Sequence, residues 1–118
     1  THLLGTSHCP PLAGAILVLE DVGEAPYRLD RLLTQWRLCG ALQQLSGLAF
    51  GRFEDCEDPE GQGFSCEQVL RERTADLGIP VLAGLPVGHG DGGNAALPLG
   101  AWARLDASGG RLSLLSAG

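Results

Sequence analysis

The chain has 118 residues, 44% of them hydrophobic, which suits one globular domain with a single core and excludes two full domains. Its only basic residues besides histidine are eight arginines, and fourteen acidic residues bring the formal net charge to −6. This balance excludes general binding to nucleic acids or to acidic membranes, because both carry negative charge that the chain would repel.

The longest uninterrupted apolar run is the five residues 15–19, and no basic segment precedes it. A membrane helix needs roughly 20 apolar residues, so we expect neither a membrane span nor an export signal. The four cysteines, Cys9, Cys39, Cys56 and Cys66, form no C-x-x-C pair, and we expect reduced thiols in a cytoplasmic protein. Because the chain contains no Met, we also expect it to be part of a longer protein.

The first predicted elements are a strand and a helix. The apolar run 15–19 is continuous rather than alternating, which is typical of a strand buried on both faces. Over about 26–44, apolar side chains recur at the spacing of one face of an amphipathic helix: Leu29, Leu32, Leu33 and Trp36. We expect this face to lie in the core, with a dimer or interdomain contact as the alternative.

The middle of the chain repeats this order. Residues 46–53 are apolar and punctuated by glycine, which suits a second inner strand. Residues 54–63 contain five acids and predict an exposed loop. Ser65 and Gln68 then form a capping box, so a second helix is predicted from there to Gly78.

A third strand and a hairpin complete the predicted fold. The strand is 81–83, and the Gly-rich segment 84–93 follows it. In residues 101–106 and 111–114, side chains of two kinds alternate as they do on the two faces of a strand, and a Gly-rich turn joins the two segments. This pattern predicts a β-hairpin. The order β-α-β-α-β plus a hairpin indicates an α/β fold: a single small domain with a mixed sheet, two helices and a C-terminal hairpin.

Two residues with reactive side chains follow inner strands. Glu20 comes directly after the run 15–19, and His89 lies between two glycines beyond the strand 81–83. The carboxyl ends of strands in open α/β sheets line the ligand crevice, so the two side chains are candidates to meet. A carboxylate that accepts one imidazole proton leaves the other nitrogen free as a general base, as in a Ser-His-acid triad. From composition alone, the alternative is a surface histidine and an ordinary capping or loop acid.

Asp21 and Glu24 are competing acids near the same strand end. Side chains alternate across a strand, so Glu20 and Asp21 point to opposite faces if the strand includes both. Glu20 also leaves the strand before the chain turns at Gly23, which favours a rigidly held position. We therefore predict that Glu20, rather than either competitor, faces His89.

The nucleophile of such a triad is missing. None of the serines lies in a G-x-S-x-G elbow or at a strand-to-helix turn: Ser7, Ser46, Ser65, Ser108, Ser113 and Ser116. The chain by itself cannot complete a triad, and we expect it to hydrolyse nothing alone.

Other candidate sites are weaker. The spacings of Cys56, Cys66, His2 and His8 match no zinc pattern, and the Gly-rich segment lacks the Lys and the following helix of a phosphate loop. We therefore predict neither a zinc site nor a phosphate loop here. Arg28 and Arg31 are interpreted as solvated or ion-paired helix residues, with contact to a substrate carboxylate as the alternative.

Four blocks of sequence carry a family resemblance in the order in which the family has them. They are residues 14–40, Gly51-Arg-Phe, residues 78–90 with the sequence GIPVLAGLPVGHG, and residues 97–105 with the sequence LPLGAWARL. They resemble the C-terminal domain of LD-carboxypeptidases, the family of murein tetrapeptide carboxypeptidases and microcin C immunity peptidases. Together they cover roughly residues 14 to 115.

The resemblance implies a two-domain serine peptidase whose C-terminal domain, of swivelling β/β/α type, is residues 14–118, preceded by the end of an interdomain linker at 1–13. It assigns Glu20 as the catalytic acid and His89 as the catalytic base of a Ser-His-Glu triad, with the serine and the oxyanion hole in an upstream nucleophile domain. It also implies a homodimer, no metal or cofactor, and hydrolysis of the L,D-peptide bond of cytoplasmic murein tetrapeptides in peptidoglycan recycling, or of peptidyl-nucleotide antibiotics.

The alternative function is a non-catalytic binding or dimerisation module derived from the same fold. The parent reading frame distinguishes the two hypotheses. A nucleophile-elbow serine encoded upstream of Thr1 favours the peptidase, whereas a gene that begins near Thr1 favours the binding module.

Overall fold

The structure is a computed structural model that describes residues 1–61 and 63–115. Gln62, in the predicted acidic loop, and residues 116–118, at the end of the predicted domain, lie outside the described residues. In chain order the elements are β1 (Ile16–Val22), α1 (Pro26–Leu38), the short 3-10 helix η1 (Leu42–Gln44), β2 (Gly47–Glu54), α2 (Cys66–Thr74), β3 (Val81–Leu82), β4 (Ala103–Asp106) and β5 (Arg111–Leu114).

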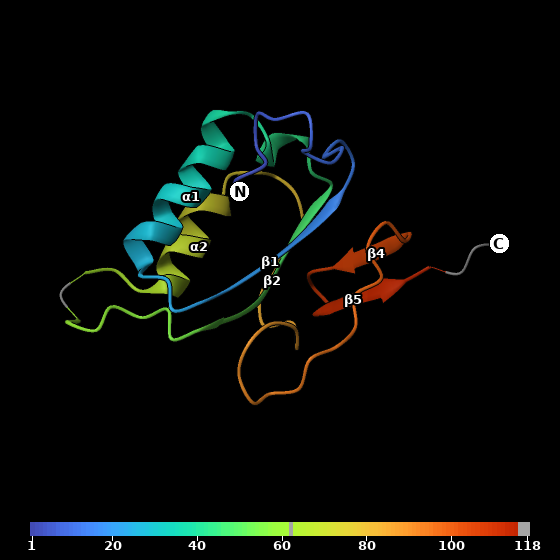
Figure 1. Ribbon diagram of the computed structural model, residues 1–118. Coiled ribbons are helices and arrows are strands. Elements are labelled where there is room, and N and C mark those ends of the chain that lie inside the picture. The colour runs from blue at the N-terminus through green and yellow to red at the C-terminus, as the bar shows by residue number, and fades with distance from the viewer. Residues whose placement is uncertain (62, 116–118) are drawn as a thin grey trace.

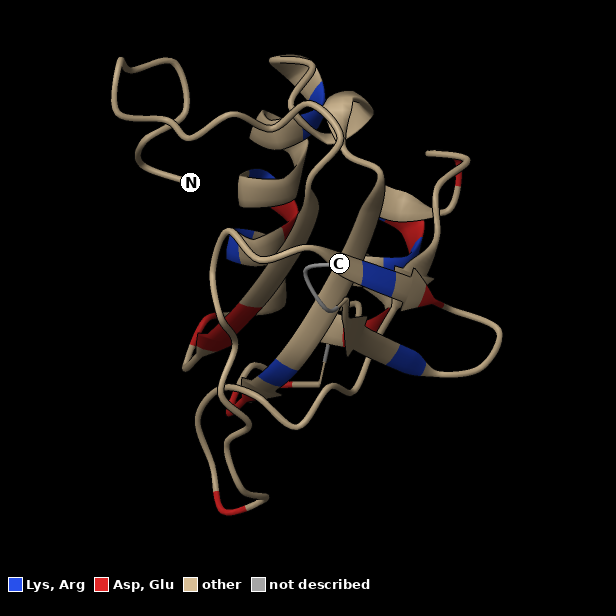
Figure 2. Cartoon of the chain, turned by 90° about the vertical axis from the view of Figure 1, so that its right-hand side faces the viewer, with Lys and Arg blue, Asp and Glu red and all other residues tan. Residues whose placement is uncertain are grey.

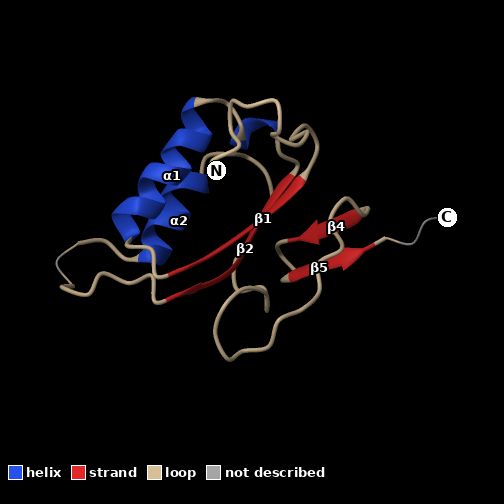
Figure 3. Cartoon of the chain, in the orientation of Figure 1, coloured by secondary structure: helices blue, strands red, loops and turns tan. Residues whose placement is uncertain are grey.

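The elements form three layers. Both helices cover one side of β1 and β2, and the β4–β5 hairpin lies on the other side (Figure 1; Figure 3). The hairpin packs closely on the sheet, because a Cβ added to Gly47 would lie 2.9 Å from Leu105 Cδ2. The predicted α/β class with two helices and a C-terminal hairpin is confirmed.

The strands divide into two sheets. β1, β2 and β3 form a parallel sheet in that order, while β4 and β5 pair antiparallel in a separate two-stranded sheet. The parallel and antiparallel pairings expected in one mixed sheet are therefore both present, but they stack on one another instead of sharing hydrogen bonds.

The expectation that residues 15–19 are buried on both faces is wrong. These residues are only partly buried, because β1 is an edge strand that pairs with β2 alone. The strand that is fully enclosed is β2, whose residues Gly47 to Gly51 are all buried between the layers. A continuous apolar run does not distinguish these two positions.

The first helix is shorter than predicted. It ends at Leu38 instead of residue 44, because Gly40 adopts a left-handed conformation with φ of +73°. The amide of Gly40 bonds to Arg37 O and that of Ala41 to Trp36 O, which is the Schellman arrangement that closes a helix.

The second helix begins as predicted and ends earlier. The Ser65 hydroxyl oxygen accepts the Gln68 amide at 3.1 Å, which confirms the predicted cap. The helix ends at Thr74, whose own hydroxyl donates to Leu70 O at 2.7 Å, and a turn leads from there to Gly78.

The core lies between the helices and β2. Of the predicted helix face, Leu29, Leu33 and Trp36 are buried. The core forms two adjoining groups: Leu12, Trp36, Ala41, Leu42, Leu45, Leu48 and Phe50 in one, and Leu29, Leu33, Cys56, Cys66 and Val69 in the other.

The four cysteines are free thiols. Burial raises the pKa of the Cys56 thiol, and it raises that of Cys66 to about 12. Within residues 1–61 and 63–115, no helix is long and apolar enough to cross a membrane. In the view of Figure 2 the arginines are interspersed with acids and form no basic face.

Candidate active site

Glu20 lies at an irregularity in the pairing of β1 with β2. Leu19 is paired with Phe50 but Asp21 with Phe53, so Gly51 and Arg52 together stand opposite the single residue Glu20. This is the arrangement of a β-bulge, in which one strand has one residue more than its partner.

The bulge changes which side chains face the helices. Phe50 and Phe53 are three residues apart, yet both line the cleft under α1, and their ring centroids are 5.8 Å apart in an edge-on contact. In a regular strand residues at this spacing lie on opposite faces. The two residues between them, Gly51 and Arg52, both contact the loop that carries His89: a Cβ on Gly51 would lie 2.6 Å from Val87 O, and the Arg52 amide donates to Val87 O at 2.9 Å.

His89 lies in the irregular segment after β3. The segment runs beside the end of β2, where the Leu85 amide donates to Phe50 O at 3.0 Å and Val87 is buried. It then turns through Gly88 and Gly90, whose φ angles of +104° and +93° are in the region that side chains other than glycine rarely adopt. These two glycines set the direction of the His89 backbone.

The structure brings Glu20 and His89 together. His89 Nδ1 lies 2.8 Å from Glu20 Oε2, and the side chains are 58% and 35% exposed. With Glu20 ionised, Nδ1 carries the proton that the carboxylate accepts, so Nε2 of the neutral imidazole is left with a free lone pair. This is the arrangement of an orienting acid and a general base.

Glycine at position 88 allows this contact. A Cβ there would lie 2.7 Å from Glu20 Oε2, closer than atoms of a real side chain approach. The loop backbone therefore rests directly on the carboxylate, and the Gly88 amide is in turn bound by the side-chain oxygen of Asn94 at 3.1 Å.

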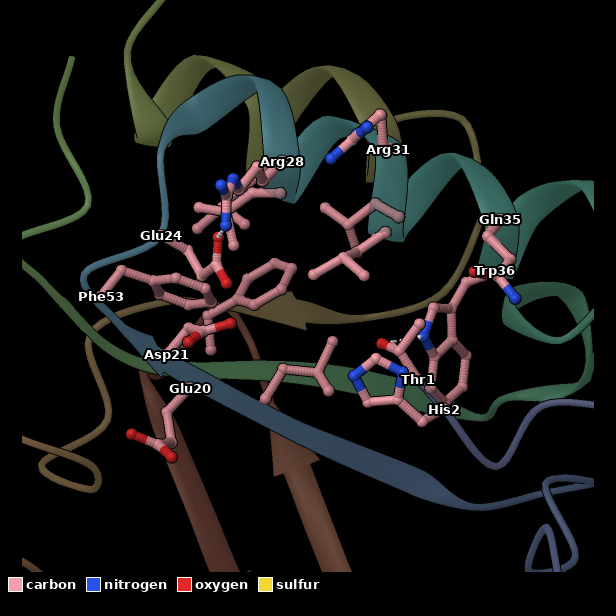
Figure 4. A pocket seen from close by; sticks show the side chains of 16 residues that line it. Thr1, His2, Glu20, Asp21, Glu24, Arg28, Arg31, Gln35, Trp36 and Phe53 are labelled. Carbon is pink, nitrogen blue, oxygen red and sulfur yellow. Dashed lines mark hydrogen bonds and ion pairs between the residues drawn. The ribbon is translucent and has the colours of Figure 1, made fainter.

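The competing acids lie elsewhere. In Figure 4, Glu20 is on the opposite side of β1 from Asp21 and Glu24, which lie toward α1. Asp21 Oδ1 accepts the amide of Val22 at 2.8 Å, and Glu24 lies 3.6 Å from the Arg28 guanidinium. Neither acid contacts the imidazole.

Arg28 and Arg31 belong to the α1 side of the sheet. Both have their guanidinium groups within 6.0 Å of the Tyr27 ring centroid, and both line a cleft of about 670 Å³ between α1 and β1. A hydrogen bond from Arg28 lowers the pKa of the Tyr27 hydroxyl. Their contacts are those of partly solvated helix residues, as predicted, and the structure does not place them beside His89.

The pair opens onto a second cleft, of about 550 Å³, on the hairpin side of the sheet. Its walls are Val18, Glu20, Val87, Gly88, His89, Asn94, Ala95, Leu97 and Leu99. This described lining contains no Ser, Thr or Cys, so the cleft has an acid, a base and apolar walls but no nucleophile of its own. No group of three or more His, Cys, Asp or Glu side chains suited to a metal ion occurs in the described part of the chain.

Sequence reasoning missed Arg52 and Asn94. The Arg52 Nε donates to His89 O at 2.6 Å, and one terminal nitrogen donates to Gly88 O at 2.8 Å and also to Gly93 O. The sequence contained one hint, because Gly51-Arg-Phe was among the blocks that resemble the family. Nothing in its spacing indicated a contact with a loop some forty residues further along.

Comparison with known proteins shows the family of the chain. Residues 1–105 match the model of a family described as "LD-carboxypeptidase C-terminal domain". A protein of Synechocystis sp. named "Putative carboxypeptidase" is 53% identical over 116 residues, which are 98% of this chain and 38% of that protein. The "Murein tetrapeptide carboxypeptidase" of Pseudomonas aeruginosa is 43% identical over 105 residues, which are 87% of this chain and 32% of that protein.

A solved structure has the same fold. The muramoyltetrapeptide carboxypeptidase from Oxalobacter formigenes superposes with a TM-score of 0.81 at 34% identity, over 96% of this chain and 40% of that chain. The present chain thus spans between 32% and 40% of the length of these relatives.

Proposed function

The chain belongs to the LD-carboxypeptidase family, in which it corresponds to the C-terminal domain, and from this premise we propose that it supplies the general base and the orienting acid of a serine carboxypeptidase. His89 is the base and Glu20 the acid. The observation that carries the proposal is the 2.8 Å contact between His89 Nδ1 and Glu20 Oε2, which leaves Nε2 unoccupied on an exposed imidazole.

In the proposed reaction, Nε2 of His89 removes the hydroxyl proton of a serine while the serine oxygen attacks the scissile carbonyl. The positive charge on the imidazolium is stabilised by the Glu20 carboxylate. The same proton then passes from Nε2 to the leaving amine as the peptide bond breaks. A water molecule then attacks the acyl-enzyme carbonyl and gives a proton to Nε2 of His89. The ester bond to the serine breaks, His89 passes that proton to the serine oxygen, and the product leaves with its new carboxylate.

The serine and the oxyanion hole belong, in this proposal, to an upstream nucleophile domain. Residues 1–13 are the end of the connecting linker and 14–118 the C-terminal domain. The absence of Ser, Thr and Cys from the described lining of the cleft beside His89 supports this division of labour, as does the chain's 32% to 40% share of its relatives' length.

The substrate we propose is a murein tetrapeptide, cleaved at the L,D-peptide bond before its terminal D-amino acid during peptidoglycan recycling in the cytoplasm. Relatives named for murein tetrapeptides are 43% and 34% identical to this chain, which favours that class over peptidyl-nucleotide antibiotics. The apolar walls of the cleft, including Leu97 and Leu99, suit the methyl-bearing side chains of such peptides.

A binding or dimerisation role is the second candidate. Leu99, Trp102 and Leu114 are 92%, 80% and 59% exposed, and all three line the groove where the hairpin meets β1. Large apolar side chains gathered on one exposed surface are typical of an interface. We propose that this surface contacts the rest of the protein or a second copy in a homodimer.

The test is release of the terminal D-amino acid from an L,D-tetrapeptide. The complete protein that carries this chain should release it, and the 118-residue chain alone should not, because base and acid have no nucleophile. Turnover by the isolated chain would contradict the two-domain proposal. Dimerisation without turnover by the complete protein would favour the second candidate.

A further inference from the structure

We propose that Arg52 is a positioning residue that clamps the His89 loop and thereby holds the imidazole against Glu20. The inference rests on the proposed function only for its effect on turnover, because the clamp itself is a geometric claim. Three carbonyl groups accept hydrogen bonds from this one side chain: those of Gly88, His89 and Gly93.

The loop needs such a clamp. Up to Val87 it is bound to β2 through backbone hydrogen bonds, from Leu85 to Phe50 and from Arg52 to Val87. Beyond Val87, the described residues 88–93 make no backbone hydrogen bond to the sheet, and only Ala95 bonds back, to Pro86 O. The segment that positions His89 therefore lacks the backbone pairing that would fix a strand.

The chemistry of the guanidinium suits this task. It is planar, permanently charged and carries five N–H donors in a fixed fork, so one group can bind several carbonyl oxygens from both ends of a loop. Arg52 takes part in none of the ion pairs found among the described residues, in contrast to Arg28, Arg37 and Arg73. Its donors are directed to the loop backbone instead.

The position of Arg52 follows from the bulge. Because Gly51 and Arg52 together stand opposite Glu20, Arg52 lies in β2 at the level of the acid, and its side chain reaches the loop that carries His89. The His89 side chain is 58% exposed, so packing does little to hold it, and its orientation depends on its backbone and on Glu20. Because Arg52 binds the backbone carbonyl of His89 itself, it fixes the backbone from which the imidazole projects.

The test compares Arg52→Ala and Arg52→Lys with Arg37→Ala in the complete protein. Arg37 is a matched control, because it also donates to a backbone carbonyl, Arg73 O at 2.8 Å, but it joins the two helices and does not line the cleft beside His89. Turnover of an L,D-tetrapeptide gives kcat and KM, and ¹⁵N-histidine NMR reports which His89 nitrogen carries the proton, with His89→Ala assigning the signal.

We expect Arg52→Ala to lower kcat about 100-fold with KM within about threefold of wild type, which is the cost of a base displaced by roughly 1 Å. The His89 spectrum should change from one tautomer, protonated at Nδ1, to a mixture. Arg52→Lys should lie between wild type and Arg52→Ala, since one ammonium cannot span three carbonyls. Arg37→Ala should leave kcat and the tautomer unchanged.

Retention of both kcat and the single tautomer in Arg52→Ala would overturn the clamp, as would equal losses in Arg37→Ala. If wild type cleaves no tetrapeptide, the proposed function fails and the tautomer alone decides the role of Arg52. If Arg52→Ala does not fold, Arg52→Lys decides. A wild-type tautomer and kcat in that variant would show that the several donors of the guanidinium are not needed, and would refute the clamp.

Discussion

The acid and the base of the candidate site are held by different means. Glu20 lies within β1, and the residues on either side of it, Leu19 and Asp21, are both paired with β2. His89 lies in a loop that has left the sheet, between two glycines with positive φ, and is held through side chains, those of Arg52 and Asn94. The acid is placed by strand pairing and the base by the clamp on its loop.

This difference predicts where substitutions will be felt. Changes in the loop should move His89 while leaving Glu20 in place, because β1 does not depend on the loop for its hydrogen bonds. Changes of the two side chains themselves should affect chemistry without affecting folding, because neither is part of the described core groups. Variants on both sides of the contact can therefore separate placement from chemistry.

Loss of the base should have the largest effect. In the complete protein, His89→Ala should lower kcat by about 10⁴- to 10⁶-fold, the range seen when the base of a triad is removed. The free energy of unfolding should change by no more than about 0.5 kcal/mol, since the side chain is mostly exposed. Kinetic assays and thermal unfolding measure both. A variant that unfolds, or keeps turnover within about tenfold, would show that His89 is structural.

Loss of the acid should cost nearly as much. Glu20→Gln keeps the shape of the side chain but can donate to Nδ1, which favours the wrong tautomer, and kcat should fall by roughly 10⁴-fold. Asp21→Asn and Glu24→Gln are the matched controls, because both acids lie on the α1 side of β1 (Figure 4). Steady-state kinetics that showed equal losses in the three variants would reject Glu20 as the specific partner.

A methyl group on the loop should have a smaller effect through placement. Gly88→Ala combines a φ of +104° with a Cβ that would lie 2.7 Å from Glu20 Oε2, so the loop must move off the acid. We expect about a 100-fold loss of kcat and about 1 to 3 kcal/mol of destabilisation. Gly84→Ala, with a φ of +81° and nothing within 4 Å, should show the destabilisation alone. Similar kinetics in the two variants would mean that crowding at Glu20 is unimportant.

The helix layer provides the smallest expected effect. The Arg37 guanidinium donates to the Asp76 carboxylate and holds its pKa below the ordinary value. The pair therefore stabilises the fold above the pKa of the unfolded carboxyl, and this contribution is lost as pH falls through the lower, folded pKa. Asp76→Asn should lower Tm at pH 7 by on the order of 1 °C and leave it unchanged in strong acid, with no change in kcat. Thermal unfolding of both proteins across pH measures this. A Tm difference between wild type and Asp76→Asn that persists in strong acid would contradict the prediction.

The sequence predicted the type and order of the elements, and with the family resemblance it also predicted the contact between Glu20 and His89. Alternation along β1 placed Glu20 and Asp21 on opposite faces, and the structure has Glu20 beside His89. Both helices and the hairpin were also predicted, because the spacing of apolar residues, the helix cap and the turn that indicate them are local in the sequence. The catalytic roles of Glu20 and His89 stay predictions until the variants are assayed.

What the sequence did not reveal depends on contacts between distant segments. The exposure of β1 follows from its place at the sheet edge, which no run of apolar residues records. The end of α1 is an exception, because Gly40 is a local stop signal that the apolar pattern beyond it concealed. Arg52 was missed because its partners are backbone carbonyls, which have no residue type to recognise.

The bulge on β2 also constrains any attempt to transplant this site onto another scaffold. Two consecutive residues, Gly51 and Arg52, must share the face that a regular strand would give to only one of them. Deleting either residue would restore regular pairing and leave Phe53 opposite Asp21 on the α1 face, but only one residue would then remain on the face toward the His89 loop. A designer would therefore have to copy an irregular strand pair as one unit, before choosing a single side chain of the catalytic pair.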